Sequence, residues 1–190
     1  MAGKPAADST FLNPDKVVTI EGTNVSLSKT SPQPVSTGAV LSITVTENTG
    51  YTLDSTVGGT CAAGSWIDGT YTTGSITADC TVSFSATINT YTVTPSGSNV
   101  SLSPSSAQSV TYGSILSLTV TGSTGYTVDS TVGGTCEAGS WSGGTYTTGA
   151  ITADCTVSFS ASVSNYTVTP SVDAQLTSTP ATAQTVIHGS

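Results

Sequence analysis

The 190-residue chain carries three Lys and no Arg against eleven acidic residues, which gives a formal net charge of −8. Such a chain is electrostatically unsuited to bind nucleic acid or an anionic membrane. No run is apolar and long enough for a transmembrane span, and no hydrophobic signal-peptide region follows Met1. We therefore expect no nucleic-acid partner and no membrane insertion, and assign residues 1–16 to a leader or tail.

An internal repeat dominates the sequence. Residues 17–90 align without a gap to residues 92–165 at a shift of 75, with 50 of 74 positions identical. A third copy opens at Tyr166 with YTVTPS, the same letters that begin at Tyr91. The repeat predicts one β module at 17–90, a second at 91–165 and an incomplete third at 166–190.

The elements predicted within a module are strands. Short apolar runs separated by Gly, Pro and Asn predict strands at 17–20, 25–27, 51–55 and 71–73. Because no stretch has a 3.6-residue apolar period, we expect helix to be nearly absent. Alternating apolar residues predict one more strand in each copy, with an inward face formed by Leu41, Ile43 and Val45 in the first and by Ile115-Leu116, Leu118 and Val120 in the second.

The last strand of each module has the clearest pattern. Between residues 80 and 88 every second residue is apolar and the residues between are Ser or Thr. A strand places such alternate residues on one face, so we expect that face to be buried. The fold class predicted is all-β, with sandwich- or grasp-like modules. The inward residues are Cys80, Val82, Phe84, Ala86 and Ile88 in the first copy and Cys155, Val157, Phe159, Ala161 and Val163 in the second.

Two cysteines recur in each complete module, Cys61 with Cys80 and Cys136 with Cys155. An even number repeated in register predicts one disulfide per module. Zinc is the competing interpretation, but four thiolates from separate modules would have to converge without any CxxC pair. Closing a loop of about 20 residues stabilises a small domain by about 3 kcal/mol. Structural disulfides also imply an oxidising compartment, so we expect a secreted or cell-surface protein.

Aromatic residues between the cysteines are candidate contact residues. Trp66 and Trp141 could stack on a sugar or on a protein partner, or they could pack on the bridge and cover the core. Tyr71 and Tyr146 have the same two interpretations. The acids that recur, Asp54 with Asp129 and Asp79 with Asp154, fit either calcium ligands or turn residues that accept hydrogen bonds.

Catalytic residues are not apparent. The single histidine, His188, lies in the incomplete third copy, so neither complete module can form a Ser–His–Asp or Cys–His set. We expect no enzymatic activity, no cofactor and no metal site.

Several short motifs resemble the divergent internalin-type B-repeats of bacterial surface proteins. They are YTVTPS, Gly113-Ser114, Gly125-Tyr126, GTYTTGAITADC and the closing VSFSA. The resemblance implies small, β-rich, grasp-like modules in a long extracellular protein, without catalytic residues. It leads us to expect an adhesin stalk or spacer whose partners are neighbouring repeats, with glycans or a host surface as further partners.

The third copy suggests an alternative function. Tyr166, Val168 and Leu176 correspond to Tyr91, Val93 and Leu102, which we expect to be core residues. Left alone they would form an apolar, unpaired sheet edge in water. The alternative is a filament subunit in which this edge pairs with another copy, or with its Met1–Lys16 leader. A carbohydrate-binding module is the third hypothesis.

Overall fold

The structure is a computed structural model that describes residues 15–171, 180 and 182–189. These residues form strands and no helix, which confirms the all-β prediction. Accordingly, the described part of the chain contains no helix that could span a membrane. The chain divides into two compact units, Met1–Ile88 and Asn89–Ser190.

The first module, which occupies the described part of the first unit, contains two sheets. One has the strand order β3-β1-β9-β5, with β6 also paired to β9, and the other has the order β2-β4-β8-β7. Both sheets contribute buried residues to one core, so the module is a sandwich. The strands are β1 (Lys16–Thr23), β2 (Val25–Leu27), β3 (Gln33–Val35), β4 (Ser42–Glu47), β5 (Tyr51–Leu53), β6 (Gly58–Gly59), β7 (Ser65–Ile67), β8 (Thr70–Thr72) and β9 (Cys80–Ile88).

The core follows the alternation expected from the sequence. Val82 and Phe84 are only 1% and 3% exposed, while Thr81 before them and Ser83 between them are partly exposed. The phase predicted for the closing strand is therefore confirmed, since a one-residue slip would have exchanged the two faces. Around these two residues pack Val18, Ile20, Val35, Leu41, Ile43, Val45, Tyr71 and Ile76.

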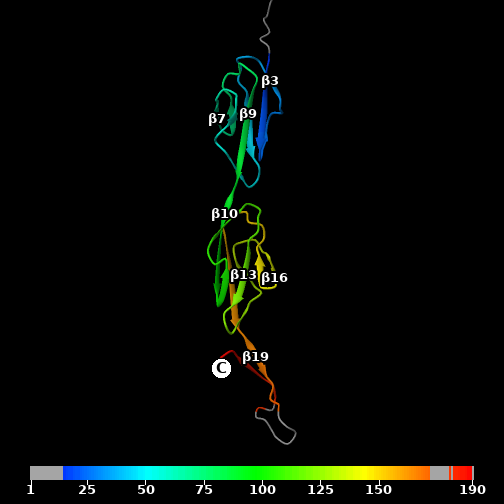
Figure 1. The fold of residues 1–190 in the computed structure, drawn as a ribbon, viewed down its shortest axis with the longest axis vertical. Helices are drawn as coiled ribbons and strands as arrows, with labels where there is room; N and C mark the ends of the chain where they lie inside the picture. Colours follow the sequence, from blue (N-terminus) through cyan, green and yellow to red (C-terminus); the bar gives the residue numbers. More distant parts are fainter. Residues whose placement is uncertain (1–14, 172–179, 181, 190) are drawn as a thin grey trace, which may run out of the picture. The chain divides into compact units, whose positions relative to one another are not determined.

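The first and last strands of the module are parallel neighbours. β1 pairs with β9 over a register that runs from Val18 opposite Cys80 to Thr23 opposite Ser85. In Figure 1 the blue β1 accordingly lies beside the green β9. Because the two strands point the same way, β1 begins at one end of the sheet and β9 ends at the other. The chain thus enters and leaves the module at opposite ends.

The second module repeats this arrangement, with sheet orders β12-β10-β18-β14 (with β15 paired to β18) and β11-β13-β17-β16. Again the first strand is parallel to the closing strand, from Val93 opposite Cys155 to Ser98 opposite Ser160. The strands are β10 (Thr90–Ser98), β11 (Val100–Ser103), β12 (Gln108–Thr111), β13 (Ser117–Gly122), β14 (Tyr126–Val128), β15 (Gly133–Gly134), β16 (Ser140–Ser142), β17 (Thr145–Thr147) and β18 (Cys155–Val163).

A proline within β10 reveals the direction of the ladder bonds. Pro95 stands where the first module has Ile20, whose N–H donates to Ser31 Oγ at 2.9 Å. Since backbone groups alternate sides along a strand, the N–H groups of Thr19 and Glu21 are the ones that face β9. A proline at this position therefore removes no hydrogen bond of the parallel ladder, which explains why it is tolerated inside a strand.

The residues of the third copy that the structure describes form a two-stranded antiparallel sheet, β19 (Asn165–Val168) with β20 (Gln184–Ile187). Tyr166 and Val168 lie in β19, whereas Leu176 lies outside the described residues.

Some details differ from the sequence-based predictions. Ile88 and Val163 are exposed because they are the last residues of their strands, beyond the buried set that ends at Ala86 and Ala161. Ile115 is also exposed, since it precedes β13 and leaves Leu116 to face the core. The strand predicted at 51–55 ends at Leu53, where the chain leaves the ladder.

Candidate functional site

The closing strand of each module is fastened at its first residue by a disulfide. Cys61 is bonded to Cys80 and Cys136 to Cys155, each with a Cα–Cα distance of 4.9 Å. These are the two bridges predicted from the sequence, and they are confirmed. Cys80 and Cys155 are also the residues opposite Val18 and Val93 in the parallel ladders, so each bridge holds the start of that ladder. Such bridges are typical of an oxidising compartment.

An aspartate extends each ladder by one hydrogen bond. Asp79 Oδ1 accepts from the Val17 N–H at 2.9 Å, and Asp154 Oδ1 accepts from the Thr92 N–H at 2.7 Å. The carboxylate thus continues the pattern beyond the cysteine, where β9 and β18 have not yet begun. The partners are 62 residues apart in sequence, so this is a tertiary contact rather than the local turn bond considered above.

The other edge of β9 is held by Asp54. Residues 54–57 leave the sheet between β5 and β6, both of which pair with β9. Across this gap Asp54 Oδ2 accepts from Ser85 Oγ at 2.5 Å, Asp54 Oδ1 accepts from Thr87 Oγ1 at 2.8 Å, and its N–H donates to the Ser85 carbonyl at 2.9 Å. The Ser85 and Thr87 hydroxyls lower the pKa of the Asp54 carboxyl, because their hydrogen bonds favour the charged form.

Asp129 has the same role in the second module. Its carboxylate accepts from Ser160 Oγ at 2.6 Å and from Ser162 Oγ at 2.8 Å, and the two hydroxyls lower its pKa. Within the described residues, no three His, Cys, Asp or Glu side chains come together as metal ligands would. The aspartates that recur act as hydrogen-bond acceptors that fasten the closing strand.

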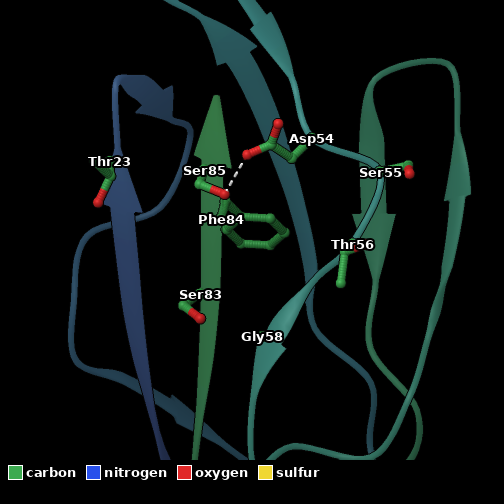
Figure 2. A pocket seen from close by; sticks show the side chains of 8 residues that line it. All are labelled: Thr23, Asp54, Ser55, Thr56, Gly58, Ser83, Phe84 and Ser85. Carbon is green, nitrogen blue, oxygen red and sulfur yellow. Dashed lines mark hydrogen bonds between the residues drawn. The ribbon is translucent and has the colours of Figure 1, made fainter. Parts of the chain in front are cut away.

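A polar groove of about 620 Å³ follows the gap left by residues 54–57. Figure 2 shows Asp54 facing Ser85 across it, with Ser83 further along β9 and Thr23 on the neighbouring β1. Its walls carry hydroxyls and one carboxylate, and the Phe84 ring belongs to the core beneath. The groove is a surface that can form hydrogen bonds, and within it the Ser85 hydroxyl already donates to the Asp54 carboxylate.

The two tryptophans form part of an aromatic cluster over the core. Trp66 lies 5.3 Å from Tyr71 and 5.7 Å from Phe84 between ring centroids, and its Nε1 donates to the Ser55 carbonyl at 3.3 Å. Trp141 repeats these contacts with its own tyrosine, phenylalanine and serine neighbours. Both indoles are partly buried against the core. The two indoles cover the core, and part of each remains exposed to solvent.

Tyr71 and Tyr146 are core residues in this structure, each 6% exposed. Their hydroxyls accept from the N–H groups of Gly64 at 2.8 Å and Gly139 at 2.7 Å. Because their rings are buried and their hydroxyls are hydrogen-bonded within the module, Tyr71 and Tyr146 are not candidate ligand contacts.

Trp141 also borders a shallow hollow of about 310 Å³. Val120 and Val128 are its apolar lining residues, and Asp129 and Ser130 line it as well. The turn beside it is Gly143-Gly144, where the first module has Asp68-Gly69. Trp141, a candidate contact residue from the sequence, thus lines this hollow.

Sequence reasoning missed the strands β6 and β15, because a Gly-Gly pair reads as a turn. A Cβ at Gly59 would lie 2.1 Å from the Thr81 carbonyl oxygen, and the residue has a φ of +105°. Only glycine permits this approach to the closing strand. The signal available in the sequence was the recurrence of GGTC immediately before the cysteine in both copies.

No protein-family model, curated protein or solved structure matches this chain significantly. The fold and the fastened closing strand nevertheless define a class: a tandem repeat of small all-β modules, each closed by its own disulfide.

Proposed function

We propose that the chain is a force-transmitting spacer of an extracellular bacterial surface protein, a stalk element rather than an enzyme. The observation that carries the proposal is the parallel pairing of the first and last strands in both modules. It puts the two ends of a module at opposite ends of its sheet, as a unit joined end to end in a longer rod requires.

The same pairing decides how a module responds to tension. When the chain is pulled from Lys16 and from Ile88, the β1–β9 ladder is loaded along its length, so its bonds resist together instead of breaking one after another. The Asp79 carboxylate adds a bond at one end of that ladder. The disulfide keeps the 19-residue segment behind Cys80 from extending. The Asp79 bond therefore opposes separation of the two strands that carry the load, and the disulfide limits how far the module extends once they separate.

The connections between elements favour transmission of force. One residue, Asn89, separates β9 from β10, and one residue, Ser164, separates β18 from β19. A connection this short leaves little slack in a stretched chain. The disulfides support an extracellular place of action, since such bridges persist in oxidising compartments. The resemblance to internalin-type repeats supports the same assignment.

Single-molecule force spectroscopy on the full chain tests the proposal. We expect two unfolding events of similar force, one per module. Glu21→Pro removes an N–H that faces β9 and leaves its acceptor unpaired, at a cost on the order of 2–4 kcal/mol. This variant should lower the unfolding force of one event and leave the other unchanged.

Ile20→Pro is the matched control, since the second module already has Pro95 there. It removes the N–H bonded to Ser31 and exchanges the buried Ile20 side chain for a smaller ring, a packing cost that the exposed Glu21 does not carry, yet it spares the β1–β9 ladder. The control should retain most of the force. Equal loss of force in both variants would contradict a role for the parallel ladder.

A second candidate function is glycan binding at the Trp141 hollow, whose lining combines the indole with Val120, Val128 and the polar residues Asp129 and Ser130. A pyranose has an apolar face and hydroxyl groups that match such a lining. Calorimetry against polysaccharides would show binding lost in Trp141→Leu and kept in Trp66→Leu. Binding that both variants retain would exclude this site.

A further inference from the structure

Both disulfides can be reached from solvent. Cys61 and Cys80 are partly exposed and line a surface hollow of about 120 Å³. Cys136 and Cys155 are also partly exposed and line a hollow of about 180 Å³. Hollows of this size have room for a small molecule rather than for a loop of a second protein. A small thiol can therefore reach either bridge while the module is folded.

Cys80 also borders a second hollow, of about 330 Å³, on the side of β1. Val17 and Thr19 of β1 line this hollow together with Asp79. Of the two bridged cysteines, Cys80 is the one that it touches. In thiol–disulfide exchange a thiolate approaches one sulfur from the side away from the other, so access decides which sulfur is attacked. The second hollow favours attack on Cys80, with Cys61 as the leaving group.

The Asp79 carboxylate determines which thiols are attracted to this bridge. Asp79 lines both hollows, and the other described residues that line them are uncharged. One of its oxygens accepts from the Val17 N–H, and a carboxylate has further acceptor positions. A negative group on an incoming thiol is repelled at this place, whereas an ammonium group is attracted.

We propose that the Cys61–Cys80 bridge is a site of thiol–disulfide exchange in the folded module, and that it reacts preferentially with small thiols that carry a positive charge. The incoming thiolate forms a bond to Cys80 Sγ, and the bond between Cys80 and Cys61 breaks with its electron pair on Cys61. Cys61 then takes up the proton that the incoming thiol released. The product is a mixed disulfide on Cys80 and a free thiol on Cys61. The proposal goes beyond the spacer function, because this exchange needs no tension.

The second bridge differs from the first by one carboxylate. Glu137 follows Cys136 and lines its hollow, where the first module has Ala62. Asp154 lines the same hollow, as Asp79 does in the first module. Because Glu137 adjoins the leaving group, its charge opposes the thiolate that forms on Cys136. The second bridge should therefore exchange about threefold more slowly than the first, or more slowly still.

Mass spectrometry of the full chain tests the proposal. The chain is treated for short times with an excess of cysteamine, a small cationic thiol, and is then alkylated. At the earliest times we expect cysteamine on Cys80 and the alkyl group on Cys61. Cysteamine on Cys61 instead, or on neither cysteine, would overturn the proposal. Glu137→Ala should raise the rate at the second bridge to that at the first, and an unchanged rate would overturn the role given to Glu137.

Asp79→Asn tests the preference for positive charge, since the amide oxygen of asparagine can still accept from the Val17 N–H. The measured quantity is the exchange rate with cysteamine divided by the rate with mercaptoacetate, an anionic thiol. Comparison of this ratio between parent and variant cancels the intrinsic reactivity of each thiol. The two thiols differ by two charges, so the ratio should fall about tenfold. Asp68→Asn removes the same charge from the β7–β8 turn and should leave the ratio unchanged. Equal ratios in the parent and Asp79→Asn would overturn the preference.

Phe84→Ala separates exchange in the folded module from exchange after unfolding. Truncation of this core residue should raise the unfolded fraction at least about a hundredfold. The rate at the first bridge should nevertheless stay that of the parent, with the bridge of the unaltered second module as the internal standard. Tyr71→Phe gives the same comparison at a smaller destabilisation. A rate that rises with the unfolded fraction would overturn the proposal. The spacer function would then still stand, since it is tested by the unfolding force of single chains.

Discussion

Reducing the disulfides should lengthen each unfolding step by a fixed amount. With the bridge intact, the segment between Cys61 and Cys80 cannot extend when the module unfolds, because its ends are held 4.9 Å apart. Reduction releases 19 residue steps of about 3.4 Å each, less that distance, so the chain gains about 60 Å per module. The second bridge has the same separation of 19, so both steps should change equally.

The assay is force spectroscopy on the full chain before and after a reductant that acts on unfolded modules. A Cys61→Ala/Cys80→Ala variant supplies an internal control, because the bridge of the second module remains. Without reductant it should give one long step and one short step, which differ by about 60 Å. Steps of equal length in this variant, or a change with reductant that departs clearly from this value, would refute the reasoning.

Three further predictions concern stability. Phe84→Ala should cost on the order of 3–5 kcal/mol in denaturant unfolding, as large core truncations do, whereas Ser83→Ala should change stability by less than about 1 kcal/mol. Tyr71→Phe should cost about 1–3 kcal/mol, because the Gly64 N–H loses its acceptor, and thermal melts would show whether it does. Folding lowers the pKa of the Asp54 carboxyl, so its charged form stabilises the folded state. This stabilisation is fully present above the ordinary carboxyl pKa and is lost as the pH falls through the lowered pKa. Melting temperature measured against pH should therefore fall below about pH 4 in the parent and fall less in Asp54→Asn; identical profiles would contradict this role.

Local patterns were sufficient to predict the closing strand. The alternation from Cys80 to Ala86 fixes which residues are inward, since a strand has a period of two. The spacing and repetition of the cysteines predict the bridges without any knowledge of the pairing between strands. These features depend on residues close together in sequence, or on the comparison of one copy with the other.

The parallel pairing of β1 with β9 could not be predicted in this way. Its partners lie 62 residues apart, and neither strand carries a local sign of its neighbour. The role of Asp79 follows from that pairing and the role of Asp54 from the pairing of β5 and β6 with the other edge of β9, so in the sequence both residues resemble turn residues or metal ligands. Likewise Trp66 and Tyr71 are equivalent candidates in sequence, and only the packing shows that the tyrosine is buried and the indole keeps some surface.

The central claim is that tension along the chain loads the β1–β9 ladder along its length. The most direct test compares two attachment geometries on the same module. Handles at Lys16 and Ile88 pull the parallel strands from opposite ends, whereas handles at Thr23 and Ile88 pull them from the same end and break their bonds in turn. The account predicts a several-fold higher unfolding force for the first geometry. Equal forces in the two geometries would contradict it.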